Sequence, residues 1–277
     1  MIFNILGRFN NTLTLITLTF NKYQGAGNDF IIIDNRSSIF NPSDSKLINR
    51  LCDRRFGIGA DGLILISAHP DADYEMKYFN SDGKIGSMCG NGGRCAAHFA
   101  FKYGIAGKKQ RFLAFDGSHE AEVTNDIVRL QMADVDEYKI VDGNYFINTG
   151  SPHYVVFTSE IDKMDVNREG KKLRWSPQFA PGGTNVNFVE TTDKGLYIRT
   201  FERGVEEETL ACGTGVTASA IASVLKGHFD TGDISVRAKG GNLKVEFDIE
   251  KEKVTNVWLT GPANFVFEGK ISTINCF

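Results

Sequence analysis

Residues 79–103 read FNSDGKIGSMCGNGGRCAAHFAFKY, and residues 201–226 read FERGVEEETLACGTGVTASAIASVLK. In each stretch an aromatic and a polar residue precede a glycine, and a Cys-Gly-polar-Gly segment then leads into a small, apolar run of helical length. Cys89 and Cys212 occupy the same place in the two copies. The chain is therefore predicted to consist of two related halves, each presenting one thiol at the start of a helix.

Length and composition limit the kind of partner that this chain is expected to bind. Its 277 residues suit two domains of ordinary size. The formal net charge of −3 gives no electrostatic reason to expect nucleic acid or an anionic membrane surface. Polar residues interrupt the apolar first twenty residues, so neither an export signal nor a membrane span is evident. A small-molecule partner is expected.

The cysteines favour a reducing compartment. There are five of them, an odd number, and no two form a Cys-x-x-Cys pair. Cys52, Cys95 and Cys276 are interpreted as small hydrophobic residues that pack in the interior.

The segments around the two copies predict many strands and two enclosed helices. Glycine turns lead into apolar strands near residues 25–33, 57–66 and 181–189. The helices predicted over 91–103 and 216–226 are apolar on most sides, so each belongs inside a sheet. The predicted fold class is α+β, with two pseudo-symmetric domains, each a mostly antiparallel, curled, barrel-like sheet around a central apolar helix. Further helical segments are expected over 45–56 and, on an outer face, over 162–175.

The predicted domain boundaries follow from this arrangement. Residues 1–17 are expected to form a non-essential N-terminal extension. Residues 18–131 together with 262–277 form the domain that carries Cys89, because the tail from residue 264 is expected to return as a strand. Residues 132–261 form the domain that carries Cys212.

The two thiols suggest chemistry at a stereocentre. A helix start favours the thiolate, and the glycines after each cysteine let the backbone approach a carboxylate. If the halves face each other, one sulfur can remove a proton from an α-carbon while the other delivers a proton to the opposite face. No lysine lies in an evident cofactor motif. An inversion of an amino acid without a cofactor is therefore expected.

Four motifs resemble those of the diaminopimelate epimerase family: MCGNGGRC at 88–95, ACGTG at 211–215, GAGNDF at 25–30 and FERG at 201–204. The resemblance covers nearly the whole chain from about residue 19. It implies two α/β domains of similar fold that close over the substrate, and interconversion of LL- and meso-diaminopimelate without a cofactor or metal, for lysine and peptidoglycan precursor synthesis. It also implies a cytoplasmic enzyme that forms homodimers.

The resemblance assigns roles residue by residue. Cys89 and Cys212 become the acid/base pair, and His153 lies beside the catalytic centre. Glu202 is expected to receive the distal ammonium group and Arg203 to help place a carboxylate. The remaining expected substrate contacts are Asn28, Asn80, Gly90, Asn91, Ser151, Asn185, Gly213 and Thr214.

Two positions depart from the family pattern. Ser151 stands where many members have asparagine, and a serine can still donate and accept a hydrogen bond over a shorter reach. Gly62 stands where many members have glutamine, and a glycine keeps only its backbone groups. Ser151 is therefore retained as an expected contact, whereas Gly62 is not expected to contact the substrate through a side chain.

Three alternatives remain open at this point. A proline or hydroxyproline epimerase would use the same two-thiol chemistry, although the asparagines and Glu202-Arg203 suit a longer substrate with a second charged end. A binding protein could keep the fold and the pocket without catalysis, although both cysteines are present. A redox or metal pair is disfavoured by the spacing of Cys89 and Cys212.

Overall fold

The computed structural model describes residues 14–86, 88–251 and 253–275, and each half of it encloses one helix. In the first half, helix α2 (Gly90–Lys102) is surrounded by β2 (Asn28–Asp34), β3 (Gly62–Ser67), β4 (Tyr74–Asn80), β5 (Lys109–Ala114), β6 (Gly117–Thr124) and β7 (Ile127–Gln131). In the second half, helix α4 (Gly213–Leu225) is surrounded by β10 (Pro152–Phe157), β11 (Asn185–Thr192), β12 (Gly195–Phe201), β14 (Asp233–Ala238), β15 (Gly241–Glu250) and β16 (Lys253–Pro262).

The two halves repeat the same order of strand pairing. From β2 to β7, consecutive strands pair parallel, antiparallel, parallel, antiparallel and antiparallel. The strands β10, β11, β12, β14, β15 and β16 pair in the same order. Each central helix lies between the third and fourth strands of its series. The predicted fold class, two pseudo-symmetric and mostly antiparallel sheets around central helices, is confirmed.

Small side chains allow the central helices to be enclosed. Ala96, Ala97 and Ala100 of α2 are fully buried, as are Ala218 and Ala220 of α4. Because alanine adds little to the radius of a helix, strands can approach from several sides and remove the whole surface from water. The helix positions therefore hold the preceding cysteines in place from within the core.

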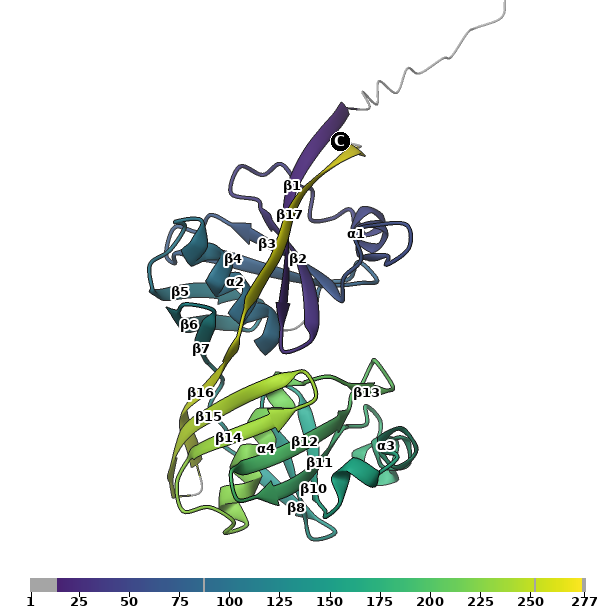
Figure 1. Ribbon diagram of the computed structural model, residues 1–277, viewed down its shortest axis with the longest axis vertical. Helices are drawn as coiled ribbons and strands as arrows, with labels where there is room; N and C mark the ends of the chain where they lie inside the picture. Colours follow the sequence, from purple (N-terminus) through teal and green to yellow (C-terminus); the bar gives the residue numbers. More distant parts are fainter. Residues whose placement is uncertain (1–13, 87, 252, 276–277) are drawn as a thin grey trace, which may run out of the picture.

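The chain passes between the halves more than once (Figure 1). β7 pairs antiparallel with β16, with Leu130 opposite Leu259, and this pairing joins the two lobes. Strand β17 (Asn264–Asn275) then returns to the first lobe and pairs with β1 (Thr14–Gly25), as predicted for the tail. The domain boundaries near 131 and 261 stay predictions.

The first strand differs from the prediction. β1 already begins at Thr14, because residues 14–17 pair with residues 272–275 of β17. These four residues are therefore part of the sheet rather than of an N-terminal extension. Residues 1–13 and Cys276 lie outside the described residues.

Two predicted helices are shorter than expected. α1 (Ser45–Cys52) is capped by Asp44, whose Oδ1 accepts a 2.9 Å hydrogen bond from the Leu47 N–H, but it ends before Asp53. Oδ1 of Asp53 accepts hydrogen bonds from the N–H groups of Arg55 and Phe56. These bonds fix a turn where a longer helix was predicted. The stretch 162–175 divides into η1 (Ile161–Lys163) and α3 (Val166–Arg174), since Asp165 caps a new helix.

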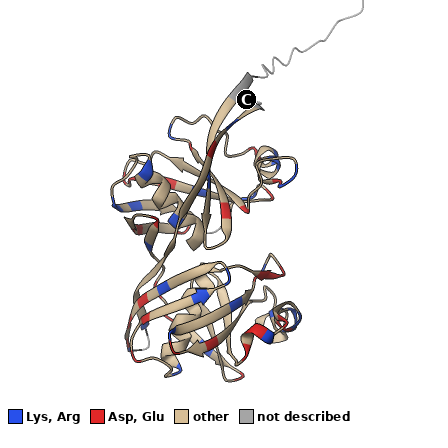
Figure 2. Ribbon diagram, viewed as in Figure 1, with Lys and Arg blue, Asp and Glu red and all other residues tan. Residues whose placement is uncertain are grey.

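Several short elements complete the second half. β8 (Tyr138–Val141) and β9 (Asn144–Asn148) form a hairpin, of which β8 was not predicted. The others are η2 (Pro177–Phe179) and β13 (Glu208–Thr209). Lys, Arg, Asp and Glu are interspersed over both lobes (Figure 2). In the described part of the chain, no helix combines the length and apolar character needed to cross a membrane.

Candidate active site

Cys89 and Cys212 hold equivalent positions at the starts of α2 and α4. Both are the capping residue, with φ and ψ of −107° and 115° for Cys89 and of −118° and 111° for Cys212. The carbonyl of Cys89 accepts a 2.7 Å hydrogen bond from the N–H of Gly93, and that of Cys212 a 2.8 Å bond from the N–H of Val216. The first N–H groups of each helix are thus left free beside a half-buried thiol.

The two helix starts lie against each other. A Cβ added at Gly213 would be 3.6 Å from the Cα of Gly90, and a Cβ added at Gly90 or Gly213 would lie 3.3 Å or 3.0 Å from the same Leu259 methyl group. The Asn91 side chain donates a 3.2 Å hydrogen bond to the carbonyl of Ala211, just before the second thiol. The structure therefore brings the two copies of the motif to one place.

The electrostatic surroundings of the thiols correct one prediction. Burial raises the pKa of both thiols, and the nearby Glu202 carboxylate raises each further. The backbone N–H groups of Gly92 and Asn91 act against this rise at Cys89, and that of Gly215 at Cys212. The prediction that the helix starts lower the pKa of the thiols is wrong, because removing a thiolate from water costs more free energy than its hydrogen bonds to the N–H groups contribute. The two thiols also lie close enough for Cys89 to raise the pKa of Cys212.

His153 is connected to Cys212 through a hydroxyl group. His153 is fully buried, and its Nδ1 lies 2.8 Å from Oδ1 of Asn187, whose amide nitrogen donates to Thr200. Because Oδ1 can only accept, Nδ1 carries the imidazole proton and Nε2 accepts from Thr214 Oγ1 at 2.8 Å. Thr214 Oγ1 lies 3.4 Å from Sγ of Cys212 and is left as an acceptor for its S–H.

This arrangement predicts a pH-dependent stability. Burial lowers the pKa of His153 from 6.5 to about 4. Between these values the unfolded chain binds more protons than the folded one, so stability falls as pH drops from 6.5 to 4, by about 3 kcal/mol. Urea unfolding of wild type and His153→Gln at pH 7 and pH 4.5 should show a smaller difference for the variant. Equal pH dependence of the two proteins would contradict a buried neutral imidazole.

Asn28 and Asn91 are joined by their side chains. The Asn91 amide nitrogen donates a 2.6 Å hydrogen bond to Oδ1 of Asn28, whose own amide nitrogen donates to Asp61 at 3.0 Å. Asn91 is 1% exposed, so its amide is fully used inside the protein. Its side chain is therefore not free to bind a ligand.

Ser151, Asn185 and Arg203 form a second cluster. The buried Asn185 amide nitrogen donates to Ser151 Oγ at 2.9 Å, and its Oδ1 accepts from the Arg203 N–H at 2.8 Å. The Arg203 guanidinium, itself exposed, donates to the same serine Oγ at 3.4 Å. Serine at position 151 thus reaches both partners, despite the shorter side chain.

Tyr78 explains why position 62 is glycine. A Cβ at Gly62 would lie 2.4 Å from Cε2 of Tyr78 and 2.5 Å from the carbonyl oxygen of Phe79. Gly62 pairs with Asn80 at the end of β4, where the exposed Asn80 side chain leaves the sheet. The Tyr78 ring therefore occupies the space that a side chain at position 62 would need. Burial raises the pKa of Tyr78, and Cys89 and Glu202 add to the rise, which places this ring near Cys89.

Gly62→Ala is expected to destabilise the protein by about 1–3 kcal/mol, because the new methyl group would overlap the tyrosine ring and a backbone oxygen. Gly107→Ala is the matched control, since a Cβ there meets its nearest neighbour at an ordinary 3.7 Å. Thermal unfolding of both variants tests this. Equal melting temperatures would show that Tyr78 moves aside freely.

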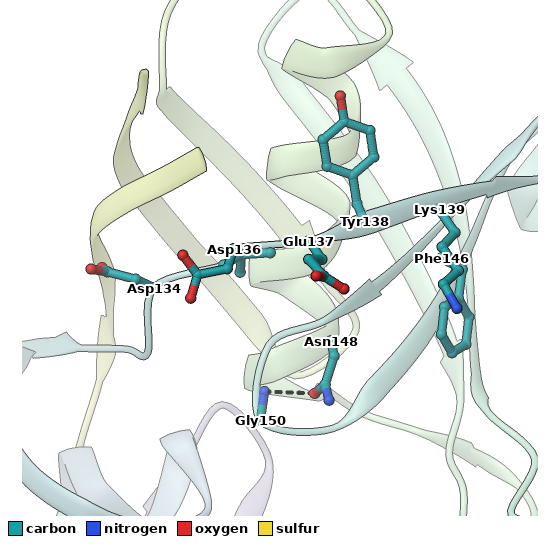
Figure 3. Close-up of a pocket in the computed structure, with 9 residues that line it drawn as sticks. Asp134, Asp136, Glu137, Tyr138, Lys139, Phe146, Asn148 and Gly150 are labelled. Carbon is teal, nitrogen blue, oxygen red and sulfur yellow. Dashed lines mark hydrogen bonds between the residues drawn. The ribbon is translucent and has the colours of Figure 1, made fainter. Parts of the chain in front are cut away.

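A separate hollow of about 480 Å³ lies where the chain enters the second lobe (Figure 3). Three acidic residues line it, and one of them, Asp136, pairs with Lys253 at 3.0 Å. Its lining includes Gly150, next to Ser151, but neither thiol. This hollow borders the Ser151 turn without belonging to the thiol site.

Three residues around the site were not predicted: Asp61, which bonds Asn28, Tyr78, which lies near Cys89, and Thr200, which bonds Asn187. Tyr78 and Thr200 hold the same place in the two copies, one residue before Phe79 and Phe201. Strand alternation was the available signal for both, because it places them opposite the neighbouring phenylalanine. Asp61 gave no comparable signal, since its contacts with Asn28 and Arg54 depend on tertiary structure.

The other cysteines take the predicted interior positions. Cys52 and Cys95 are buried and free, which confirms the interpretation for these two. Cys276 lies outside the residues that the structure describes, so its interpretation stays a prediction. Across residues 14–275, with the gaps at 87 and 252, no group of three His, Cys, Asp or Glu side chains is arranged to hold a metal ion.

The fold is shared with proteins of known structure. It is similar to a phenazine biosynthesis protein of the PhzF family from Bacillus anthracis, with a TM-score of 0.75, 15% identity and coverage of 92% of this chain and 99% of that one. A probable proline racemase from Agrobacterium radiobacter gives a TM-score of 0.66 at 15% identity, with 92% of each chain covered. The arrangement of strands around two central helices places this chain in the same structural class of two-domain α+β proteins as these two structures.

The sequence specifies the family within this class. The family model for diaminopimelate epimerase matches residues 20–138 and 145–266. A diaminopimelate epimerase from Flavobacterium psychrophilum is 51% identical, over 90% of this chain and 98% of its own length. One from Chlorobaculum tepidum is 46% identical, over 90% and 99%. The chain belongs to the diaminopimelate epimerase family.

Proposed function

We propose that this protein interconverts LL- and meso-diaminopimelate by a two-base mechanism in which Cys89 and Cys212 are the acid/base pair. The observation that carries the proposal is the pair of half-buried thiols at neighbouring, matched helix starts. Membership of the family supports the choice of substrate.

In this mechanism each thiol acts from one face of the α-carbon. The ionised sulfur takes the α-proton and becomes a thiol, while the opposite thiol gives its proton to the other face and becomes the thiolate. The negative charge that develops spreads into the α-carboxylate. We expect the N–H groups at the two helix starts, at Gly90, Asn91, Gly213 and Thr214, to hold that carboxylate and so stabilise the transition state.

The remaining predicted residues suit the distal end of the substrate. Glu202 is half-buried and acts electrostatically on both thiols, so a cation bound to it lies within the same site. Arg203 and Ser151, positioned by Asn185, present hydrogen-bond donors for a second carboxylate. Asn28 and Asn80 are the proposed contacts from the first half. We assign the enzyme to lysine and peptidoglycan precursor synthesis in the cytoplasm, as a homodimer.

The test is reaction of the purified, reduced protein with LL-diaminopimelate in D₂O without added cofactor. The meso isomer should form with deuterium at the inverted carbon, measured by NMR and chiral chromatography. A folded protein with free thiols that neither forms meso product nor exchanges the α-proton would overturn the proposal. Turnover of proline or hydroxyproline instead would transfer the same two-thiol chemistry to another substrate.

A further inference from the structure

Arg94 is a buried cation without an acidic partner in the described residues. Its side chain is fully buried, and it forms no ion pair with any Asp or Glu there. The guanidinium donates instead to uncharged oxygens, at 3.3 Å to the carbonyls of Pro262 and Gly90 and at 2.9 Å to Oδ1 of Asn91. Its positive charge therefore stays uncompensated.

Burying an uncompensated charge costs free energy, so a nearby anion would stabilise the folded protein. The ionisable groups that act on Arg94 are the thiols of Cys89 and Cys95. Cys95 is fully buried, and burial raises its pKa to about 12. Cys89 is half-exposed and has the N–H groups of Asn91 and Gly92 beside its sulfur, so it is the thiol that can become the anion.

The surroundings of Cys212 favour the protonated form, because burial raises its pKa most and Glu202 and Cys89 raise it further. Thr214 gives its hydroxyl proton to His153, so its oxygen accepts from the S–H of Cys212. A thiolate at Cys212 would lose this hydrogen bond and would be repelled by the lone pairs of the Thr214 oxygen. The two thiols are therefore unequal, although their helix starts match.

We propose that Arg94 is a positioning residue that decides which thiol ionises: its guanidinium favours the thiolate at Cys89, so Cys89 is the first base and Cys212 the first acid. This inference rests on the proposed two-thiol function. Arg94 acts through the α2 start, since it fixes the Gly90 carbonyl and the Asn91 side chain, and Asn91 in turn reaches the Ala211 carbonyl.

Other charged and titratable groups face Cys89 from each neighbouring element. Glu202 lies after β12, Tyr78 on β4 and Cys212 at the start of α4. Glu202 raises the pKa of Cys89, and Cys89 in turn raises the pKa values of Tyr78 and Cys212. The N–H groups of Gly92 and Asn91 lower the pKa of Cys89, and Arg94 is the charged group that acts in the same direction.

The test measures thiolate formation without reference to turnover. The rates at which iodoacetamide alkylates Cys89 and Cys212 are followed against pH, with mass spectrometry to separate the sites. In wild type Cys89 should react at lower pH than Cys212. Arg94→Gln should slow alkylation of Cys89 about ten-fold at pH 7.5, equivalent to a midpoint about one pH unit higher, with Cys212 unchanged. Arg94→Lys should restore most of the rate, and Arg237→Gln, which removes an exposed arginine of the second half, should change neither site.

Two results would overturn the inference: Cys212 reacting at lower pH than Cys89 in wild type, or an unchanged Cys89 midpoint in a folded Arg94→Gln protein. Should Arg94→Gln fail to fold, the wild-type order and Arg94→Lys still decide. Alkylation does not require epimerisation. If wild type is inactive but Arg94→Gln shifts the Cys89 midpoint, the proposed function alone is refuted. If wild type is active but Arg94→Gln leaves the Cys89 midpoint unshifted, the role of Arg94 alone is refuted.

Discussion

Cys89→Ala and Cys212→Ala are each expected to lower kcat for epimerisation at least about a thousand-fold, because each removes one of the two groups that move a proton at the α-carbon. A single remaining thiol can reach only one face, so inversion stops even if substrate still binds. Chiral chromatography of the products from LL-diaminopimelate, with equal amounts of each folded variant, measures the loss.

The matched control is Cys52→Ala, which removes a buried thiol of the first half that lies outside the site. It should keep nearly wild-type kcat and lose only a little stability, because a small cavity replaces one sulfur. If either Cys89→Ala or Cys212→Ala kept a tenth of the wild-type kcat, the two-base mechanism would be wrong. The comparison separates a catalytic thiol from one that merely packs.

The architecture could be predicted because the sequence repeats. Two copies of one motif, each followed by a helix rich in small residues, imply two enclosed helices, and the matched strand pairing bears this out. The ends of elements were harder to predict. Side-chain caps such as Asp53 and Asp165 end or restart a helix over one turn, and apolar periodicity does not register them.

The site was predictable as a set of residues but not as a set of interactions. Asn91, for example, was expected to contact the substrate, yet its side chain forms its hydrogen bonds with Asn28, Ala211 and Arg94. The net rise of the thiol pKa depends on how much of each sulfur is buried, which no local pattern encodes. Arg94 reads as one more polar residue in a helix until the structure shows that it is fully buried.

Glu202→Gln is expected to raise KM for diaminopimelate about 100-fold, because the proposed partner of the distal ammonium loses its charge. The same change should act on the chemistry in the opposite direction. Burial is the largest cause of the raised pKa of both thiols, but the Glu202 carboxylate raises both as well. Without its charge the thiolate forms more readily, so the acidic limb of the kcat profile should move to lower pH.

Glu207→Gln provides the control, since Glu207 is exposed, whereas Glu202 is half-buried and acts on both thiols. It should leave KM and the pH profile unchanged. Kinetics at a series of pH values separate the two effects, because substrate binding appears in KM and thiol ionisation in kcat measured at saturation. A higher KM with an unshifted kcat profile would mean that Glu202 binds the substrate without tuning the thiols. A shifted profile with an unchanged KM would mean that the distal ammonium binds elsewhere, and would remove Glu202 from the proposed substrate site.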